Sequence, residues 1–145
     1  MICRKPSIRH ATNFDSPRIQ EMLQANDLWV DGLDWSELSG WFVAEHKSHV
    51  VGATQILHGK PCGCIMYITV DPEYIGSGVG LALWQFAKLM LGIKGADAIL
   101  TFTTNEWIIR KADKLGITLL KDFTATCQRI PNLRGSTINE TKHLY

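Results

Sequence analysis

Three glycines alternate along one short stretch of the sequence, between an apolar run that ends at Val70 and a segment with a helical pattern. They are Gly76, Gly78 and Gly80. The N-terminus of a helix exposes N–H groups without partners and has partial positive charge. Glycine lets the backbone adopt positive φ and approach a ligand closely. These residue types in this order predict an anion cradle, usually for phosphate, and the other interpretation is a glycine-rich turn without a ligand.

Two common phosphate-binding signatures do not fit this loop. A P-loop requires Gly-Lys and then Ser or Thr, whereas Gly80 is followed by Leu81. The dinucleotide fingerprint G-x-G-x-x-G fails because Gly76 and Gly78 are followed by Leu81, and Gly78 and Gly80 by Leu83. That fingerprint also belongs to a parallel βαβ unit, whereas an antiparallel meander is expected before this loop.

The pattern of apolar residues and turn signals predicts the elements that position the loop. Strands are expected over residues 7–12, 41–46, 50–57, 62–70, 97–104, 117–120 and 123–130. Helices are expected from Ser16-Pro17, with the serine as N-cap, from a capping box at 34–37, and over 81–91 and 105–116. The predicted fold class is α/β, an α+β mixed sheet of about six or seven mostly antiparallel strands, flanked by about four helices.

The overall composition limits the classes of function. The 145 residues, 46% hydrophobic and 20% charged, suit a single domain over 1–130 with a polar C-terminal tail over 131–145, either loose or an arm of a homodimer. The formal net charge of +1 argues against nucleic acid as a partner. No apolar run is long enough to cross a membrane, and the first residues lack the apolar core of a signal peptide, so we expect a cytoplasmic protein. Cys62 and Cys64 are too close for zinc-finger spacing, which predicts reduced strand cysteines and no metal site.

Five positions around the glycines match a family motif. Val70, Pro72, Tyr74, Gly78 and Gly80 fit V-x-P-x-(Y/W/F) followed by Arg/Gln-x-x-Gly-x-Gly/Ala. The stretch thus resembles the pyrophosphate loop of the GNAT superfamily of N-acetyltransferases. The expected order of elements over residues 7–130 is also similar to that of the family.

This resemblance implies acetyl-CoA, or another acyl-CoA, as co-substrate and no metal. The N–H groups from Gly76 to Gly80 would hold the pyrophosphate. The strand that ends at Val70 would splay from its neighbour, so that the pantetheine arm pairs with its exposed backbone. A main-chain N–H near Val70 would polarise the thioester carbonyl, as in an oxyanion hole. The implied cofactor-binding residues are Ile68, Val70, Ile75, Gly76, Ser77, Gly78, Val79, Gly80 and Asn105.

A second stretch, residues 103–117, resembles the family's N-x-x-A-x-x-x-Y-x-x-x-G-F helix through Asn105, Leu115 and Gly116. The resemblance places Asn105 at the pantetheine, and a helix cap is its structural alternative. Two positions depart from the family. Ile75 replaces the Arg or Gln of the loop, which removes one contact to phosphate. Ala112 replaces the tyrosine that protonates the leaving thiolate.

The acceptor side is less well defined by the sequence. A primary amine must lose a proton before it attacks, and the candidate bases are Tyr67 and His46, with a water relay as the alternative. The tyrosine is otherwise a core aromatic residue and the histidine a surface residue at a hairpin end. The segment between the first two expected helices contains Trp29, Asp31 and Trp35, which would suit a cationic amine with an apolar part. Alternatively, its tryptophans belong to the core.

Two hypotheses follow for function. The first is an N-acetyltransferase that moves an acetyl or other acyl group from acyl-CoA to a small-molecule or peptide amine by direct transfer in a ternary complex. The second is a catalytically weak or inactive CoA-binding module on the same fold. The intact glycine loop supports CoA binding in both cases, whereas Ile75 and Ala112 favour the second.

Overall fold

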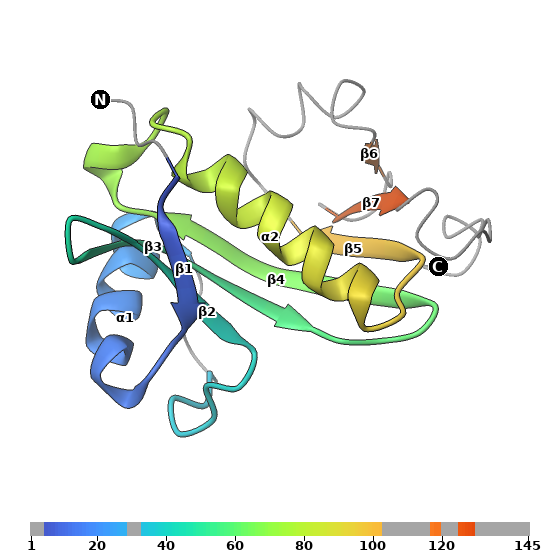
Figure 1. Ribbon diagram of the computed structural model, residues 1–145, viewed down its shortest axis with the longest axis horizontal. Helices are drawn as coiled ribbons and strands as arrows, with labels where there is room; N and C mark the ends of the chain where they lie inside the picture. The colour runs from blue at the N-terminus through green and yellow to red at the C-terminus, as the bar shows by residue number, and fades with distance from the viewer. Residues whose placement is uncertain (1–4, 29–32, 103–116, 120–124, 130–145) are drawn as a thin grey trace. The chain divides into compact units, whose positions relative to one another are not determined.

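The computed structural model describes residues 5–28, 33–102, 117–119 and 125–129 (Figure 1). By contact density the chain forms two compact units, which are described one at a time. The first unit consists of Met1–Gln55 and Tyr67–Ala87, and the second of Ile56–Met66 and Lys88–Tyr145. The single domain expected over 1–130 stays a prediction, and the tail lies outside the described residues.

Four strands contribute to the first unit, in the hydrogen-bonded order β1-β2-β3-β4. The elements in chain order are β1 (Ser7–His10), the 3-10 turn η1 (Asn13–Asp15), α1 (Ser16–Ala25), β2 (Trp41–His46), β3 (His49–Leu57), β4 (Cys62–Val70), the 3-10 turn η2 (Pro72–Tyr74) and α2 (Val79–Ile93). The pairs β1–β2 and β2–β3 are antiparallel. Strands β3 and β4 and helix α2 continue into the second unit.

The second unit adds three strands, in the order β4-β5-β7-β6. These are β5 (Ala98–Phe102), β6 (Ile117–Leu119) and β7 (Ala125–Arg129). β5 pairs with β4 in parallel, and β7 pairs with β5 and β6 in antiparallel fashion. A mixed sheet with helices confirms the predicted fold class, and all seven expected strands are present. The helix expected over 105–116 lies outside the described residues.

Helices α1 and α2 cover opposite faces of β2. Met22 of α1 belongs to a buried cluster with Trp41 and Val43. Phe42, between them in sequence, instead meets Phe86 of α2 edge-on, with ring centroids 4.9 Å apart. Because successive side chains of a strand point to opposite faces, β2 separates two apolar layers.

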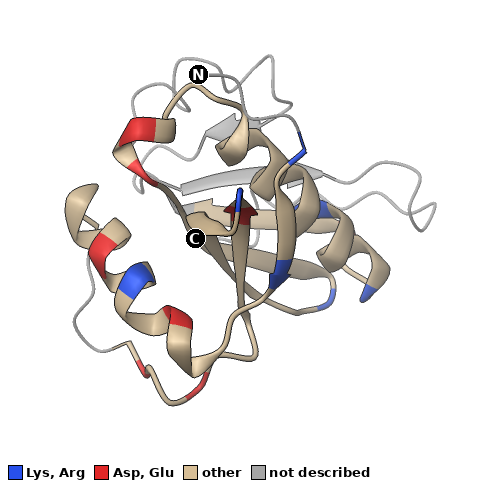
Figure 2. Cartoon of the chain, turned by 60° about the vertical axis from the view of Figure 1, so that its left-hand side comes forward, with Lys and Arg blue, Asp and Glu red and all other residues tan. Residues whose placement is uncertain are grey.

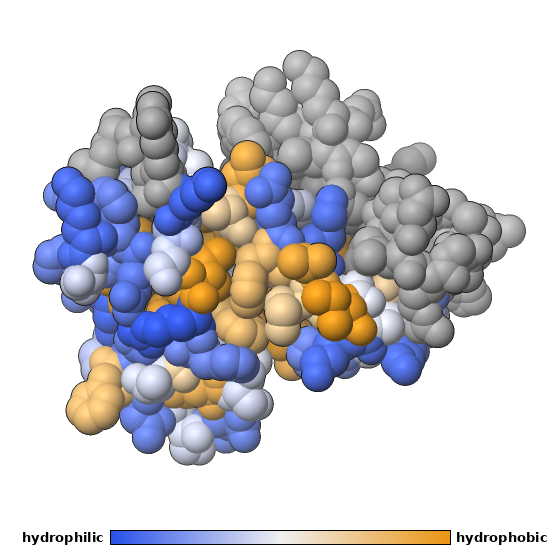
Figure 3. Space-filling model, in the orientation of Figure 1, coloured by the Kyte–Doolittle hydropathy of each residue, from blue (hydrophilic) through white to orange (hydrophobic). Residues whose placement is uncertain are grey.

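Helix α2 is apolar on most of its circumference. Leu81 and Ile93 remain exposed at 53% and 65% of their surface. Figure 3 shows a largely apolar stretch of surface along this helix. On the buried side, a Cβ atom at Gly52 of β3 would lie 2.8 Å from Val79 Cγ1 and 2.9 Å from Leu83 Cδ1. The missing side chain at Gly52 therefore lets the first turns of α2 rest directly on β3.

The helix expected from the capping box at 34–37 does not form, and residues 33–40 make turns instead. The carboxylate of Asp34 accepts hydrogen bonds from the N–H of Ser36 at 2.9 Å and from its hydroxyl at 2.5 Å. Glu37 accepts one from the N–H of Ser39 at 2.8 Å. Such short-range bonds from side chain to backbone compete with helix formation, which explains why the prediction was wrong.

The start of α1 also differs from the prediction. The helix begins at Ser16, and Asp15 stands at its N-cap, because η1 already brings the chain into helical geometry. The buried Asp15 carboxylate accepts from the N–H of Thr12 at 2.7 Å and from the guanidinium of Arg9 at 2.7 Å and 3.0 Å. The serine N-cap is therefore wrong, and Pro17, expected at the first helical position, takes the second position of the first turn.

Candidate functional site

The last residues of β4 present backbone groups along an edge that no described strand pairs with. The N–H of Asp71 donates to the carbonyl of Val51 in β3 at 2.9 Å. Since backbone groups alternate between the two edges of a strand, the N–H and C=O of Val70 and Ile68 face away from β3. On that side the register with β5 ends at Ile65. The end of β4 thus offers donors and acceptors to an extended ligand.

The glycine loop follows η2 and adopts the conformation that its residue types require. Gly76 and Gly78 have φ of 84° and 99°, a region that favours glycine. Between them the N–H of Ser77 donates to the carbonyl of Tyr74 at 3.0 Å, which closes the turn. Helix α2 then begins at Val79. The predicted sequence of strand, glycine turn and helix is therefore present.

The first turn of α2 has N–H groups available for a ligand. Its first backbone bond runs from the N–H of Ala82 to the carbonyl of Gly78 at 3.0 Å. The N–H groups of Val79, Gly80 and Leu81 consequently have no acceptor within the helix. Together with the helix dipole, these donors favour a negatively charged group.

Two further observations fit a phosphate-bearing ligand at this loop. The hydroxyl of Ser77 is buried and has no hydrogen-bond partner among the described residues. A Cβ atom built at Gly76 would meet nothing within 4 Å, and one at Gly80 would meet only Val70 Cγ2 at 3.5 Å. The loop therefore borders open space, and Gly80 places it against the end of β4.

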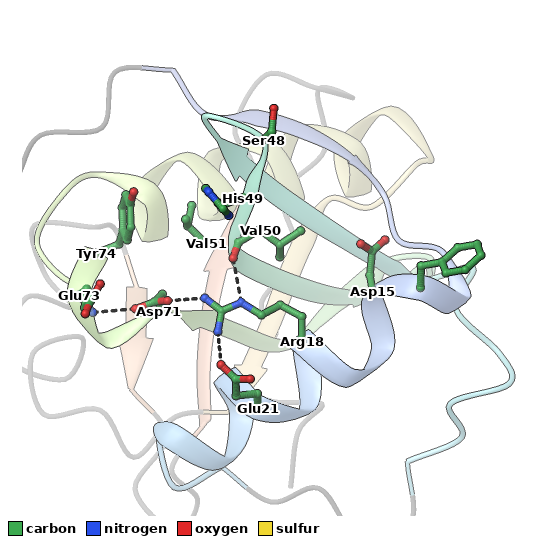
Figure 4. Close-up of a pocket in the computed structure, with 11 residues that line it drawn as sticks. Asp15, Arg18, Glu21, Ser48, His49, Val50, Val51, Asp71, Glu73 and Tyr74 are labelled. Atoms are coloured by element: carbon green, nitrogen blue, oxygen red, sulfur yellow. Dashed lines mark hydrogen bonds and ion pairs between the residues drawn. The ribbon is translucent and has the colours of Figure 1, made fainter.

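Helix α1 fixes the residue that follows β4 through a guanidinium group (Figure 4). Arg18 forms an ion pair with Asp71, a second with Glu21 at 2.5 Å, and a hydrogen bond to the carbonyl of Val50 at 3.0 Å. Asp71 also accepts from the N–H of Glu73 at 2.8 Å, which caps η2. Burial alone would raise the pKa of Asp71, but the N–H of Glu73 and the guanidinium of Arg18 lower it below its ordinary value.

A hollow of about 560 Å³ lies beside this ion pair, between the first turns of α1, the β2–β3 turn and η2 (Figure 4). Its charged lining consists of Asp15, Arg18, Glu21, Asp71 and Glu73. Arg18 neutralises two of these carboxylates from its centre. The hollow therefore lies next to the end of β4, and two of the carboxylates that line it are already paired with Arg18.

A second anchor from α1 reaches β4 at the other end of the helix. The carboxamide Nδ2 of Asn26 lies 2.8 Å from the carbonyl oxygen of Val70, 2.8 Å from Thr69 Oγ1 and 3.0 Å from the carbonyl of Met22. The hydroxyl of Thr69 donates to the same Met22 carbonyl at 3.2 Å. Sequence reasoning missed both Arg18 and Asn26. The available signal was their spacing, because positions 18, 22 and 26 follow one face of a helix.

The two candidate bases lie in different surroundings. Tyr67 stacks on Trp41, with ring centroids 5.7 Å apart, and burial raises the pKa of its phenol. This agrees with the interpretation as a core aromatic residue. His46 Nδ1 lies 3.1 Å from the hydroxyl of Tyr74 in η2. The imidazole therefore contacts the turn that leads into the glycine loop.

The expected acceptor residues are only partly described. Trp35 stacks on Trp41 with ring centroids 5.6 Å apart and packs against the buried cluster of the first unit, as its structural alternative requires. Asp34 and Glu37 are exposed on the turn that precedes β2, where acidic segments are visible in Figure 2. Six residues singled out from the sequence lie outside the described residues: Trp29, Asp31, Asn105, Ala112, Leu115 and Gly116.

The expectation of strand cysteines holds for β4. Cys62 and Cys64 are both half-buried, and burial raises the pKa of the Cys64 thiol to about 11. The part of the chain that the structure describes has no cluster of side chains suited to a metal ion. Within that part, no helix is both long and apolar enough to span a bilayer.

Comparison with known families and structures gives one family and one fold. The acetyltransferase (GNAT) family model matches residues 7–116. No match was found among curated proteins.

Among solved structures, N-acetylglutamate synthase from Neisseria gonorrhoeae, complexed with coenzyme A and L-arginine, superposes with a TM-score of 0.75 at 19% identity. That alignment covers 87% of this chain but 33% of the synthase, so the chain spans about a third of that protein. Ard1 from Thermoplasma volcanium gives 0.69 at 18% identity, with 86% of this chain and 97% of that chain covered. PaiA N-acetyltransferase from Thermoplasma acidophilum, in complex with coenzyme A, gives 0.70 at 12% identity, with 88% and 100% covered.

Proposed function

Because the chain belongs to the GNAT acetyltransferase family, we propose that it transfers an acetyl or other acyl group from acyl-CoA to a primary amine, directly within a ternary complex. The observation that supports this most is the glycine loop. It combines positive φ at Gly76 and Gly78 with unpaired N–H groups at the start of α2, next to the end of β4. Two solved structures with a similar fold, the N-acetylglutamate synthase and PaiA N-acetyltransferase, contain coenzyme A.

The glycine loop and the end of β4 would bind different parts of acyl-CoA. The N–H groups of Val79, Gly80 and Leu81, with the glycine turn before them, would hold the pyrophosphate. The backbone of Ile68 and the N–H of Val70 would face the pantetheine arm along the edge away from β3, because the Val70 carbonyl already accepts from Asn26. The thioester supplies an activated acyl carbon, and the N–H of Val70 would donate to its carbonyl oxygen as negative charge develops there.

The acceptor amine has to lose a proton before it can attack. The Tyr67 phenol, whose ordinary pKa of about 10 is raised further by burial, is protonated at neutral pH and is therefore a poor base. His46, or water held nearby, is the better acceptor of that proton. The acceptor itself would bind near Trp35, with Trp29 and Asp31 as further expected contacts. Because Trp35 stacks on Trp41, at the opposite end of β2 from His46, the proton of an acceptor bound there would pass to water.

Departure of CoA would proceed without the tyrosine that Ala112 replaces. A thiol has an ordinary pKa of about 8.5, so its thiolate leaves fairly well without a proton. General acid assistance is worth roughly 10²–10⁴-fold, and we expect its absence to cost the lower end of that range. This loss, with Ile75 in the loop, favours the alternative of a CoA-binding module with little or no catalysis.

One experiment separates these functions. The protein is incubated with acetyl-CoA and a panel of primary amines, and released CoA is followed with a thiol reagent, with the amine omitted as control. We expect amine-dependent release together with a rise in Tm on adding CoA; binding to the native state at a hundredfold excess over Kd stabilises by about 2.7 kcal/mol. A rise in Tm without release for any amine supports the binding module. No rise at millimolar CoA refutes both.

A further inference from the structure

We infer that Asn26 is a positioning residue for the Val70 amide: its carboxamide fixes the end of β4 in the orientation that acyl transfer needs. The role in transfer rests on the proposed function. The anchoring itself rests on hydrogen bonds that connect helix α1 to the last two residues of β4.

The Asn26 carboxamide holds a peptide group that is also held from its other side. The peptide between Val70 and Asp71 has its C=O bound by Asn26 Nδ2 at 2.8 Å and its N–H bound to Val51 O at 2.9 Å. Thr69, just before, is tied to α1 through its hydroxyl. Both neighbours of the Val70 N–H are therefore fixed, and the direction of that N–H follows from them.

The anchor matters because this strand end lacks a described partner on its other edge. A strand end paired on one side only opens more readily than one in the middle of a sheet. An oxyanion donor is effective only when it already points at the place where charge develops. Arg18 adds a third tie from α1, through Asp71. These side chains of α1 hold the strand end next to the edge with which no described strand pairs.

A simpler role for Asn26 is to cap the C-terminus of α1. It stands at the C-cap, and its side chain bonds the Met22 carbonyl at 3.0 Å. A cap needs only that contact, whereas Asn26 Nδ2 also faces two acceptors on β4. The two roles differ in what they predict for residues 69–71, which lie far from the helix end in sequence.

The test uses Asn26→Ala, which removes the donor, and Asn26→Asp, which keeps the shape but offers a carboxylate that cannot donate at neutral pH. Gln24→Ala, an exposed position on the same helix turn, is the matched control. The first readout is hydrogen exchange of the Asp71 amide in the protein without ligand. Loss of one or two hydrogen bonds should speed exchange roughly fivefold to thirtyfold in both Asn26 variants and not in the control.

The second readout is kinetic. If the N–H of Val70 is displaced, kcat should fall by about tenfold to a hundredfold, while the Kd of CoA, set by the glycine loop, stays within about threefold. A pure capping role predicts instead that Tm falls while kcat and Asp71 exchange stay as in the control. Unchanged exchange in both Asn26 variants overturns the anchoring. Faster exchange with normal kcat overturns the role in transfer, and a wild-type protein that releases no CoA with any amine refutes the proposed function while the exchange result still stands.

Discussion

The glycine loop and the end of β4 lie close together, since a Cβ atom at Gly80 would come within 3.5 Å of Val70 Cγ2, yet they are held in opposite ways. The loop is shaped by its own backbone, through positive φ at two glycines and one short-range bond from Ser77 to Tyr74. The strand end is held by side chains of α1, which reach across sequence separations of 53 and 44 residues. A ligand-binding loop with few ties can adapt to phosphate, whereas a strand end that orients an oxyanion donor has to be rigid.

The largest effect is expected from Gly78→Val, which tests whether the glycine loop binds CoA. Gly78 has φ of 99°, where a β-branched residue is strained, and any side chain there would also crowd an approaching phosphate. We expect the Tm shift with CoA to disappear while the far-UV circular dichroism of the folded protein is retained. The matched control is Gly80→Ala, since a Cβ there meets only Val70 Cγ2 at 3.5 Å. Normal CoA binding by the Gly78 variant would show that the loop is not the cradle.

This contrast also explains which features the sequence revealed. A backbone position with positive φ favours glycine at that same position, so the requirement is visible in the sequence. Three alternating glycines after a strand were therefore enough to predict the loop. That β2, β3 and β4 are neighbours in the sheet was predicted from their short connecting turns in the same way. Arg18 and Asn26 could not be assigned, because a polar residue on a helix is equally compatible with solvent until its distant partner is known. The false helix at 34–37 arose because the same polar residues that begin helices also form short-range turns.

A smaller effect is expected from Gly52, where the first turns of α2, which follow the glycine loop, rest on β3. A Cβ there would approach Val79 Cγ1 to 2.8 Å and Leu83 Cδ1 to 2.9 Å, and both side chains are fully buried. Gly52→Ala should therefore cost about 1–3 kcal/mol of unfolding free energy, measured by urea titration with an unchanged m-value. The displaced first turn of α2 should also weaken CoA binding. Stability equal to wild type would mean that α2 does not depend on this close approach.

The two regions should also respond differently to acid. The Arg9 guanidinium, with the N–H of Thr12, lowers the pKa of Asp15 against the opposing effect of burial, and the pKa of Asp71 is lowered as well. A carboxyl whose folded-state pKa lies below its unfolded value, about 3.9, stabilises the fold above that pH and loses this contribution as pH falls further. Below about pH 4, the exchange rate of the Asp71 amide, corrected for the intrinsic rate, should rise before that of the Ser77 amide, whose hydrogen-bond partner is a carbonyl.

Asp15→Asn should be less stable than wild type at neutral pH and should lose less stability on acidification. An equal dependence of the unfolding free energy on pH in the two proteins would contradict this account.

The smallest expected effect concerns Ile75, which stands where the family has Arg or Gln. Its side chain is 66% exposed, so it contributes little to the core, and its replacement should leave the urea midpoint almost unchanged. Ile75→Arg adds a cation beside a backbone cradle that already supplies directional N–H donors. Because the new charge is exposed and screened by salt, it should tighten CoA binding only by about twofold to fivefold at low ionic strength, and by less at high salt. Ile75→Gln offers the donor without the charge and should show the smaller, salt-independent part of the gain. A gain of a hundredfold from Ile75→Arg would show that side chains, rather than the backbone, govern anion binding here, and the contrast between the two regions would then fail.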